Sequence, residues 1–179
     1  MSLEFNVSQL LKSEVGQTRV YDFDAEAPID LDGSSANDVH GHVKFALTNF
    51  GVVATGEADG VLQLNCARCL EDFHQSAHVE FVDEYRPTID IGTGLASSVP
   101  QSETAFDISS NHTIDLREAL RQHFLLAVDL IPVCREDCQG LCPTCGVNRN
   151  VEHCSCPPPE EPSPFAVLQG LLGDRSSDQ

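Results

Sequence analysis

The sequence is poor in lysine and in large aromatic residues, and each shortage excludes a class of protein. Among its 179 residues there are two lysines (Lys12 and Lys44), two tyrosines and no tryptophan. Asp and Glu outnumber Lys and Arg by 28 to 10, which gives a formal net charge of −18. A chain this acidic is repelled by nucleic-acid phosphates and by anionic membranes. We therefore expect a basic protein partner rather than general nucleic-acid binding.

Long apolar runs are also missing. No stretch approaches the roughly 20 apolar residues that a membrane span needs. The first ten residues lack a basic segment followed by an apolar run, so we expect a cytoplasmic protein. No Ser/His/Asp order, phosphate-cradling glycine loop or paired-carboxylate setting stands out. We therefore expect no enzyme, no catalytic residues and no small-molecule substrate.

Alternating hydrophobicity in the middle of the chain predicts strands. Val39, Val43, Phe45 and Leu47 share one face of such a strand. The predicted strands cover residues 18–23, 39–50, 52–58, 61–64 and 77–86, and Asp59-Gly60 is predicted to be a hairpin turn. We expect an α+β fold, built on an antiparallel β meander or a partly open barrel with a few short helices.

Helices are predicted on both sides of these strands. Residues 3–15 have room for one short helix that Gly16 ends, and residues 116–128 have helical spacing. Asp115 is the expected N-cap of the second helix, with Glu118 completing a capping box. Residues 25–38 and 87–113 are expected to be loops, the second of them mobile.

Eight cysteines stand in four close pairs, which is unusual for a protein expected in a reducing compartment. There, closely spaced cysteines bind metal more often than they form disulfides. The Cys-Pro-Thr-Cys-Gly sequence suits a tight turn, because Pro143 fixes φ and Gly146 accepts a positive φ. Backbone amides of such a turn can donate to the sulfurs, so the sequence predicts zinc knuckles. The expected metal ligands are Cys66, Cys69, Cys134, Cys138, Cys142, Cys145, Cys154 and Cys156.

Eight thiolates make two closed sites, which are typical of structural rather than catalytic zinc. One grouping joins the pair at 66 and 69 to the pair at 134 and 138, and leaves a local site between residues 142 and 156. The other grouping joins the knuckles at 66/69 and 142/145 as a zinc ribbon. We favour the first grouping, because its second site closes within 15 residues at little cost in loop entropy.

Domain boundaries follow from this pattern. Residues 1–132 form the expected β-rich domain, and residues 133–156 form a cysteine-rich module docked on it. Residues 157–179 are expected to be a proline-rich linker and a short helix. The buried stripe of that helix is expected to contain Phe165, Leu168, Leu171 and Leu172.

Other polar residues near these motifs have competing interpretations. His40 and His42 are candidates for a further metal site, but a solvated strand face is favoured. His153 is a candidate replacement for one sulfur ligand, and His123 is expected at the edge of the core. Three arginines beside cysteines either offset thiolate charge or contact RNA phosphate: Arg68, Arg135 and Arg149.

Five segments share one order and spacing: Asn65-Cys66-Ala67-Arg68-Cys69-Leu70, Asp115–Leu120, Ile131-Pro132-Val133-Cys134, Gly140–Asn148 and Pro164–Leu168. Together they resemble the bacterial YceD family over roughly residues 40–172. The resemblance implies a role in the accumulation of large-subunit 23S ribosomal RNA. The family's CxRC pair corresponds to Cys66 and Cys69, and the later cysteines match its cysteine-rich branch. The family has no established catalytic residues to carry over.

Charge and resemblance together lead to one hypothesis and two alternatives. The hypothesis is an acidic, zinc-stabilised adaptor or escort for a basic large-subunit ribosomal protein or for the pre-ribosomal particle. One alternative is direct binding of ribosomal RNA through the zinc knuckles and their arginines. The other is a zinc or redox sensor with exchangeable zinc at Cys154 and Cys156.

Overall fold

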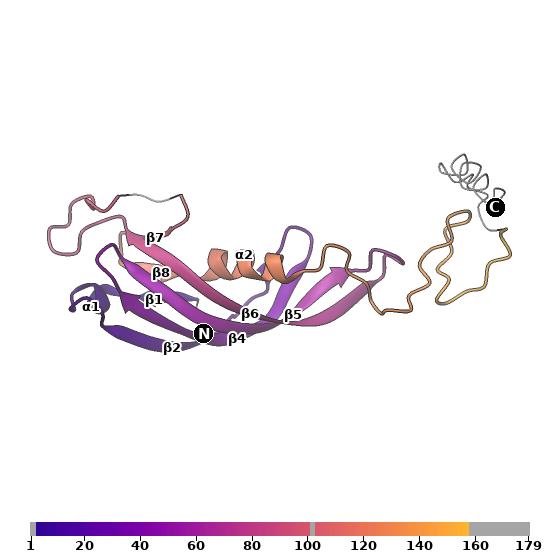
Figure 1. The fold of residues 1–179 in the computed structure, drawn as a ribbon, viewed down its shortest axis with the longest axis horizontal. Coiled ribbons are helices and arrows are strands. Elements are labelled where there is room, and N and C mark those ends of the chain that lie inside the picture. The colour runs from indigo at the N-terminus through magenta and orange to yellow at the C-terminus, as the bar shows by residue number, and fades with distance from the viewer. Residues whose placement is uncertain (1–2, 101–102, 158–179) are drawn as a thin grey trace, which may run out of the picture.

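The computed structural model describes residues 3–100 and 103–157, and its main feature is one open, twisted sheet (Figure 1). The strands follow the order β2 (Thr18–Asp24), β4 (Ser35–Leu47), β5 (Val52–Asn65), β6 (Asp72–Pro87) and β7 (Phe106–Ile108), and β3 (Ile29–Asp30) pairs with β4. Neighbours are antiparallel except for β6 and β7, which are parallel. Because β2 and β7 end the path unpaired with one another, the sheet is open. The α+β prediction is confirmed, as a meander rather than a barrel.

The predicted turn at Asp59-Gly60 is wrong, because β5 runs through both residues. Asp59 lies opposite His78 and Gly60 opposite Ala77, in a register without a shift along β5 and β6. Gly60 lacks the positive φ that a tight hairpin requires. A Cβ there would stand 3.2 Å from the ring of Phe124. The glycine therefore serves the close approach of a helix to the strand.

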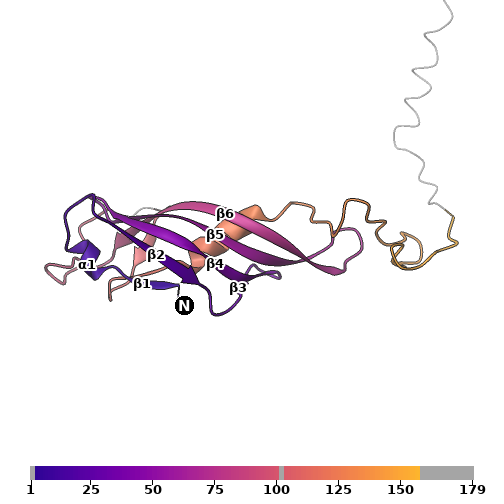
Figure 2. The same cartoon turned by 90° about the horizontal axis from the view of Figure 1, so that it is seen from below.

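That helix is α2 (Arg117–Ala127), which lies across one face of the sheet (Figures 1 and 2). Its apolar stripe is buried as predicted: Leu116, Ala119, Leu120 and Phe124. The predicted N-cap is wrong by one residue, because Leu116 rather than Asp115 precedes the helix, although the Asp115 carboxylate accepts the Arg117 N–H at 2.8 Å. Glu118 bonds to Arg121 and Gln122 instead of completing a capping box. His123 lies at the core edge, 3.1 Å from Asp83.

The N-terminal prediction is only partly correct. Instead of one helix over residues 3–15, the chain forms β1 (Glu4–Asn6) and a single turn, α1 (Ser8–Leu11). Strand β1 pairs with β8 (Thr113–Asp115) in a separate two-stranded sheet. Phe5 packs against Tyr21 and Phe45 with ring centroids 5.3 and 5.5 Å away. This tertiary packing, rather than local helix propensity, decides the conformation.

Both predicted loops contain strands. Residues 25–38 include β3 and the first residues of β4, and residues 87–113 include β7, whose Ile108 is fully buried. Two- and three-residue strands carry too little alternation to be recognised from sequence. The predicted C-terminal helix and nearly all of its linker lie outside the described residues.

Candidate metal centres

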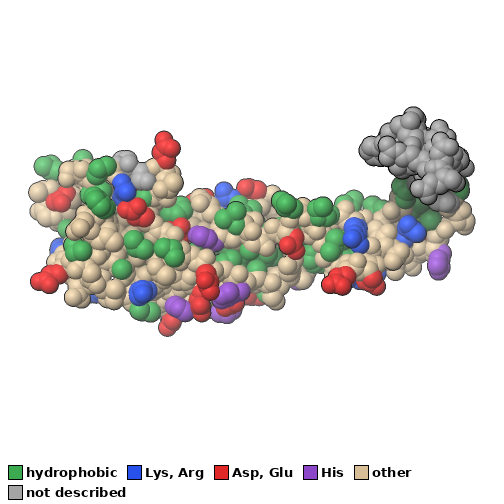
Figure 3. Space-filling model, in the orientation of Figure 1, with side chains coloured by type: hydrophobic (Ala, Val, Ile, Leu, Met, Phe, Trp, Pro, Cys, Tyr) green, Lys and Arg blue, Asp and Glu red, His purple; other side chains and the backbone are tan. Residues whose placement is uncertain are grey.

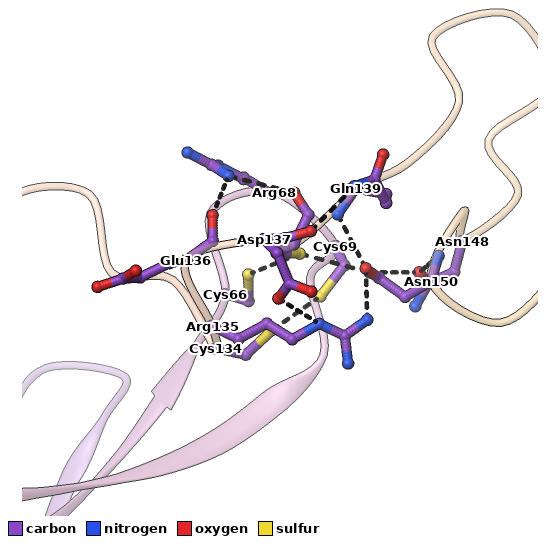
Figure 4. A network of polar contacts seen from close by, with 11 residues as sticks. Cys66, Arg68, Cys69, Cys134, Arg135, Glu136, Asp137, Gln139, Asn148 and Asn150 are labelled. Carbon is purple, nitrogen blue, oxygen red and sulfur yellow. Dashed lines mark hydrogen bonds and ion pairs between the residues drawn. The ribbon is translucent and has the colours of Figure 1, made fainter.

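Four cysteines meet where the sheet contacts the segment after α2. Cys66 and Cys69 stand on the turn that joins β5 to β6, and Cys134 and Cys138 come from beyond the helix. We call these four residues the first cluster (Figure 4). Their sulfurs lie within 4.8 Å of one another, with 3.8 Å between Cys66 and Cys138. Three of the four side chains are buried.

The other four cysteines form a second cluster farther along the chain. Its members are Cys142, Cys145, Cys154 and Cys156, whose sulfurs also lie within 4.8 Å of one another. Here only Cys142 is buried, and Cys145 is exposed. The two clusters are those of the first grouping derived from loop entropy, not those of a zinc ribbon.

One knuckle in each cluster follows the same backbone pattern. The N–H of Cys66 donates to the Glu71 carbonyl, and the N–H of Leu70 donates to the Cys66 carbonyl. In the second cluster the N–H of Cys142 donates to the Val147 carbonyl, and the N–H of Gly146 donates to the Cys142 carbonyl. The sequence separations of these two bonds are the same as in the first cluster. The fourth residue after the first cysteine has a left-handed backbone in both, at φ 63° for Leu70 and 74° for Gly146.

The sulfur positions fit a tetrahedral metal ion. Four thiolates at about 2.3 Å from zinc lie about 3.8 Å from one another. The separations of Cys66 from Cys138 and of Cys69 from Cys134 are both 3.8 Å. A disulfide needs about 2.05 Å between sulfurs, and all eight cysteines are free. Both clusters therefore offer the donor set of a closed structural zinc site.

Within each cluster, the pKa is lowered for some thiols and raised for others. Burial raises the pKa of Cys66, but backbone hydrogen bonds from Cys134, Cys69 and Arg68 together lower it to about 6. Backbone hydrogen bonds from Cys145 and Thr144 lower the pKa of Cys142 to about 6.

Other members hold their protons more tightly. Burial and the neighbouring thiol of Cys138 raise the pKa of Cys134 to about 12, while Cys145 and burial raise that of Cys156 to about 12. A divalent cation would replace these retained protons, so its binding would release protons to solvent.

Polar side chains fix the first cluster in place (Figure 4). Arg68 donates to the carbonyl oxygens of Glu136 at 3.1 Å and of Cys138 at 3.2 Å. Arg135 donates to Asn150 at 2.7 Å and pairs with Asp137 at 3.3 Å. Two of the three candidate arginines are thus held by local protein groups.

Asn150 is a site residue that sequence reasoning missed. Its Nδ2 lies 3.4 Å from the sulfur of Cys138, and its Oδ1 accepts the N–H of Gln139 at 2.8 Å. It belongs to the loop of the second cluster yet contacts the first. The only sequence signal is its place in Asn148-Arg149-Asn150, a polar run between cysteine pairs.

The remaining histidine candidates join neither cluster. Among the described residues, no third group of metal-ligating side chains contains His40, His42 or His153. His40 bonds to the Asp38 carbonyl oxygen, and His42 lies 3.6 Å from Glu57 on an exposed strand face. His153 is exposed and lines a cavity beside the second cluster.

Comparison with known proteins gives a family and a few relatives. The family model described as large ribosomal RNA subunit accumulation protein YceD matches residues 54–172. An uncharacterized protein of Mycobacterium tuberculosis is 32% identical over 97 residues, which cover 54% of this chain and 44% of that protein. A protein of Zea mays, named large ribosomal RNA subunit accumulation protein YCED homolog 1, chloroplastic, is 30% identical over 131 residues, covering 60% and 43%.

These matches are partial in length. The chain spans less than half of the curated relatives that it matches. No solved structure matches it significantly. Within residues 3–100 and 103–157, no helix has both the length and the apolar character to cross a membrane.

Proposed function

Because the chain belongs to the YceD family, we propose that it supports the accumulation of large-subunit 23S ribosomal RNA as an acidic, zinc-stabilised adaptor or escort. The observation that carries the proposal is the match of the family model to residues 54–172. The maize relative, which carries the same function in its name, supports it. The direct partner in this proposal is a basic large-subunit ribosomal protein or another assembly factor on the pre-ribosomal particle.

Charge and site chemistry support an adaptor rather than a catalyst. The net charge of −18 favours a basic protein over an RNA backbone. Each cluster supplies four sulfurs and would leave a bound ion no open position for a substrate. The ion would supply structural cross-linking when bound. Residues 133–156 are then a module held on the β-rich residues 1–132 through the first cluster.

Affinity purification of the tagged chain from its own cells, with and without nuclease, tests the proposal. We expect a basic large-subunit ribosomal protein or assembly factor to survive nuclease treatment, because it contacts the protein directly. Loss of every protein partner on nuclease treatment would contradict the adaptor. Unchanged levels of 23S ribosomal RNA after deletion of the gene would contradict the wider function.

One observation favours direct RNA binding as a second candidate. A cavity of about 440 Å³ beside the second cluster is lined by Arg149, Gln139, Thr144 and His153, which are donors suited to a phosphate. Glu152 also lines it and opposes an anion. Arg149→Glu should weaken RNA retention and reduce its dependence on salt concentration if this candidate holds. Under the adaptor proposal the same variant leaves the protein partner bound.

A further inference from the structure

Strand β6 leaves most of one side without a partner. It extends over Asp72–Pro87, but among the described residues β7 pairs only with Tyr85, Arg86 and Pro87. Residues 72–84 therefore form a free edge of 13 residues along the border of the sheet (Figure 2). At every second residue of such an edge, a backbone N–H and C=O point away from the sheet.

This edge has only part of the usual protection against strand pairing, namely one inward-facing charge, Asp83, which bonds to His123 of α2. Proteins commonly protect long edges with lysine, proline or a bulge. Residues 72–84 contain no lysine and no proline, and their register with β5 has no shift. The opposite edge strand β2 has seven residues and carries a cation, Arg19. An open and regular edge of this length is suited to the addition of another strand.

The sheet face beside the edge is acidic. Cross-strand register places Asp22, His42, Glu57 and Glu80 in one row, and Asp24, His40, Asp59 and His78 in the next. Figure 3 shows acidic and histidine side chains gathered along the lower margin of the molecule. Neither of these two rows contains a lysine. Lys44 lies in the adjacent row, with Val20, Thr55 and Val82.

The two faces of β6 define the pattern of a matching strand. Its outward side chains are Asp72, His74, Ser76, His78, Glu80 and Val82, and its inward side chains include the apolar Phe73, Ala77, Val79 and Phe81. A strand beside β6 would meet two carboxylates on the outward face, Asp72 and Glu80, and mostly apolar groups on the inward face. A second copy of this chain carries the same net charge of −18, so its approach to this edge would be repulsive.

We propose that the free edge of β6 binds an extended, basic segment of a partner protein by strand addition, with Lys or Arg at the positions that face Asp72 and Glu80. The inference rests on the proposed function only for the identity of the partner as a ribosomal protein. Backbone hydrogen bonds provide the affinity, and the carboxylates select the basic sequence.

A labelled 13-residue peptide that alternates Lys with Val and Thr tests this with the full chain, by fluorescence anisotropy. Glu80→Lys and Asp22→Lys change the net charge equally and lie in the same row, at opposite edges. We expect Glu80→Lys to weaken binding about tenfold and Asp22→Lys by less than about twofold, because only the first opposes the docked strand. Circular dichroism and the thermal midpoint verify that both variants are folded.

A second matched pair and a modified peptide keep the result decisive. Val82 is 68% exposed and Val20 64% exposed at the two ends of one row, so Val82→Lys should weaken binding more than Val20→Lys. A peptide N-methylated at alternate residues should lose binding, while the unmodified peptide should slow hydrogen exchange in residues 72–84.

Three results would overturn the proposal. The first is that both lysine substitutions of a pair weaken peptide binding equally. The second is that the N-methylated peptide binds as tightly as the unmodified one, and the third is that the chain dimerises through this edge. Because the assay contains no ribosomal component, its failure leaves the purification experiment on the proposed function unaffected.

Discussion

The two cysteine clusters share a donor set and a knuckle but differ in what they connect. The first joins the β5–β6 turn to Cys134 and Cys138. Cys134 lies 65 residues beyond Cys69 in the sequence. The second closes within residues 142–156. The first is mostly buried, whereas the second has an exposed Cys145. Identical sets of four cysteines therefore bring distant segments together in one place and lie within one local loop in the other.

Burial connects the first cluster to the main core. Cys66, Cys69 and Cys138 form a small buried group, and Phe73 packs against both this group and the core of the sheet. Loss of a metal there would open a contact between distant parts of the chain. Loss of a metal from the second cluster would release its own loop and, with it, the contacts of Asn150 with the first cluster.

The largest expected effect follows from removing a ligand of the first cluster. We expect Cys69→Ser to lower the free energy of unfolding by about 4 kcal/mol or more, because loss of a structural metal is among the most destabilising changes. Denaturant unfolding of the zinc-loaded full chain measures this. The matched control Cys145→Ser should lower it by no more than about 2 kcal/mol, the loss expected if its loop and the contacts of Asn150 are released. Equal losses would contradict the division of roles between the clusters.

Metal release should distinguish the clusters next. We expect a chelator to remove the metal of the second cluster at least about tenfold faster, because Cys145 is exposed and its loop opens without disturbing the sheet. Native mass spectrometry of Cys69→Ser and Cys145→Ser, each retaining one site, gives the two rates. Faster loss from the variant that keeps only the first cluster would reverse the comparison.

Asn150 tests whether the clusters are linked. We expect Asn150→Ala to destabilise the first cluster by about 1–2 kcal/mol, since it removes bonds to the Cys138 sulfur, the Gln139 N–H and Arg135. Metal competition at that cluster measures the change. Gln139→Ala is the control, because its side chain donates only to the nearby Asp137 carbonyl. Equal effects of the two substitutions would show that Asn150 is not the link.

The smallest effect concerns the knuckles themselves. Leu70 is 65% exposed and holds the left-handed conformation that Gly146 holds in the second knuckle. We expect Leu70→Gly to stabilise the chain by about 0.5–1 kcal/mol, because glycine adopts this conformation without Cβ strain. Gly146→Leu should weaken metal binding at the second cluster. The thermal midpoint checks the first prediction and zinc competition checks the second. A lower thermal midpoint for Leu70→Gly would contradict the equivalence of the two knuckle turns.

Some of this arrangement could be predicted from sequence because the determining signals are local. Alternation identified the long strands, and helical spacing identified α2 to within one residue at each end. The close spacing of Cys142 to Cys156 favoured the local grouping that the structure has. Metal binding at these residues stays a prediction.

The misses have tertiary causes. Strand β1 pairs with β8, more than a hundred residues away, and three residues carry no period. Asp59-Gly60 is a strong turn signal, but the packing of Phe124 on Gly60 keeps it within β5. Asn150 contacts a sulfur 12 positions away, and no spacing rule indicates that contact.

The most direct test of the central claim is the metal content of the double variant Cys69→Ser/Cys134→Ser, measured by native mass spectrometry after purification with zinc. Both residues belong to the first cluster, so the account predicts that the wild-type chain binds two ions and that the variant retains one, in the second cluster. A zinc ribbon would place the two residues in different sites. A variant that binds no ion would contradict the account.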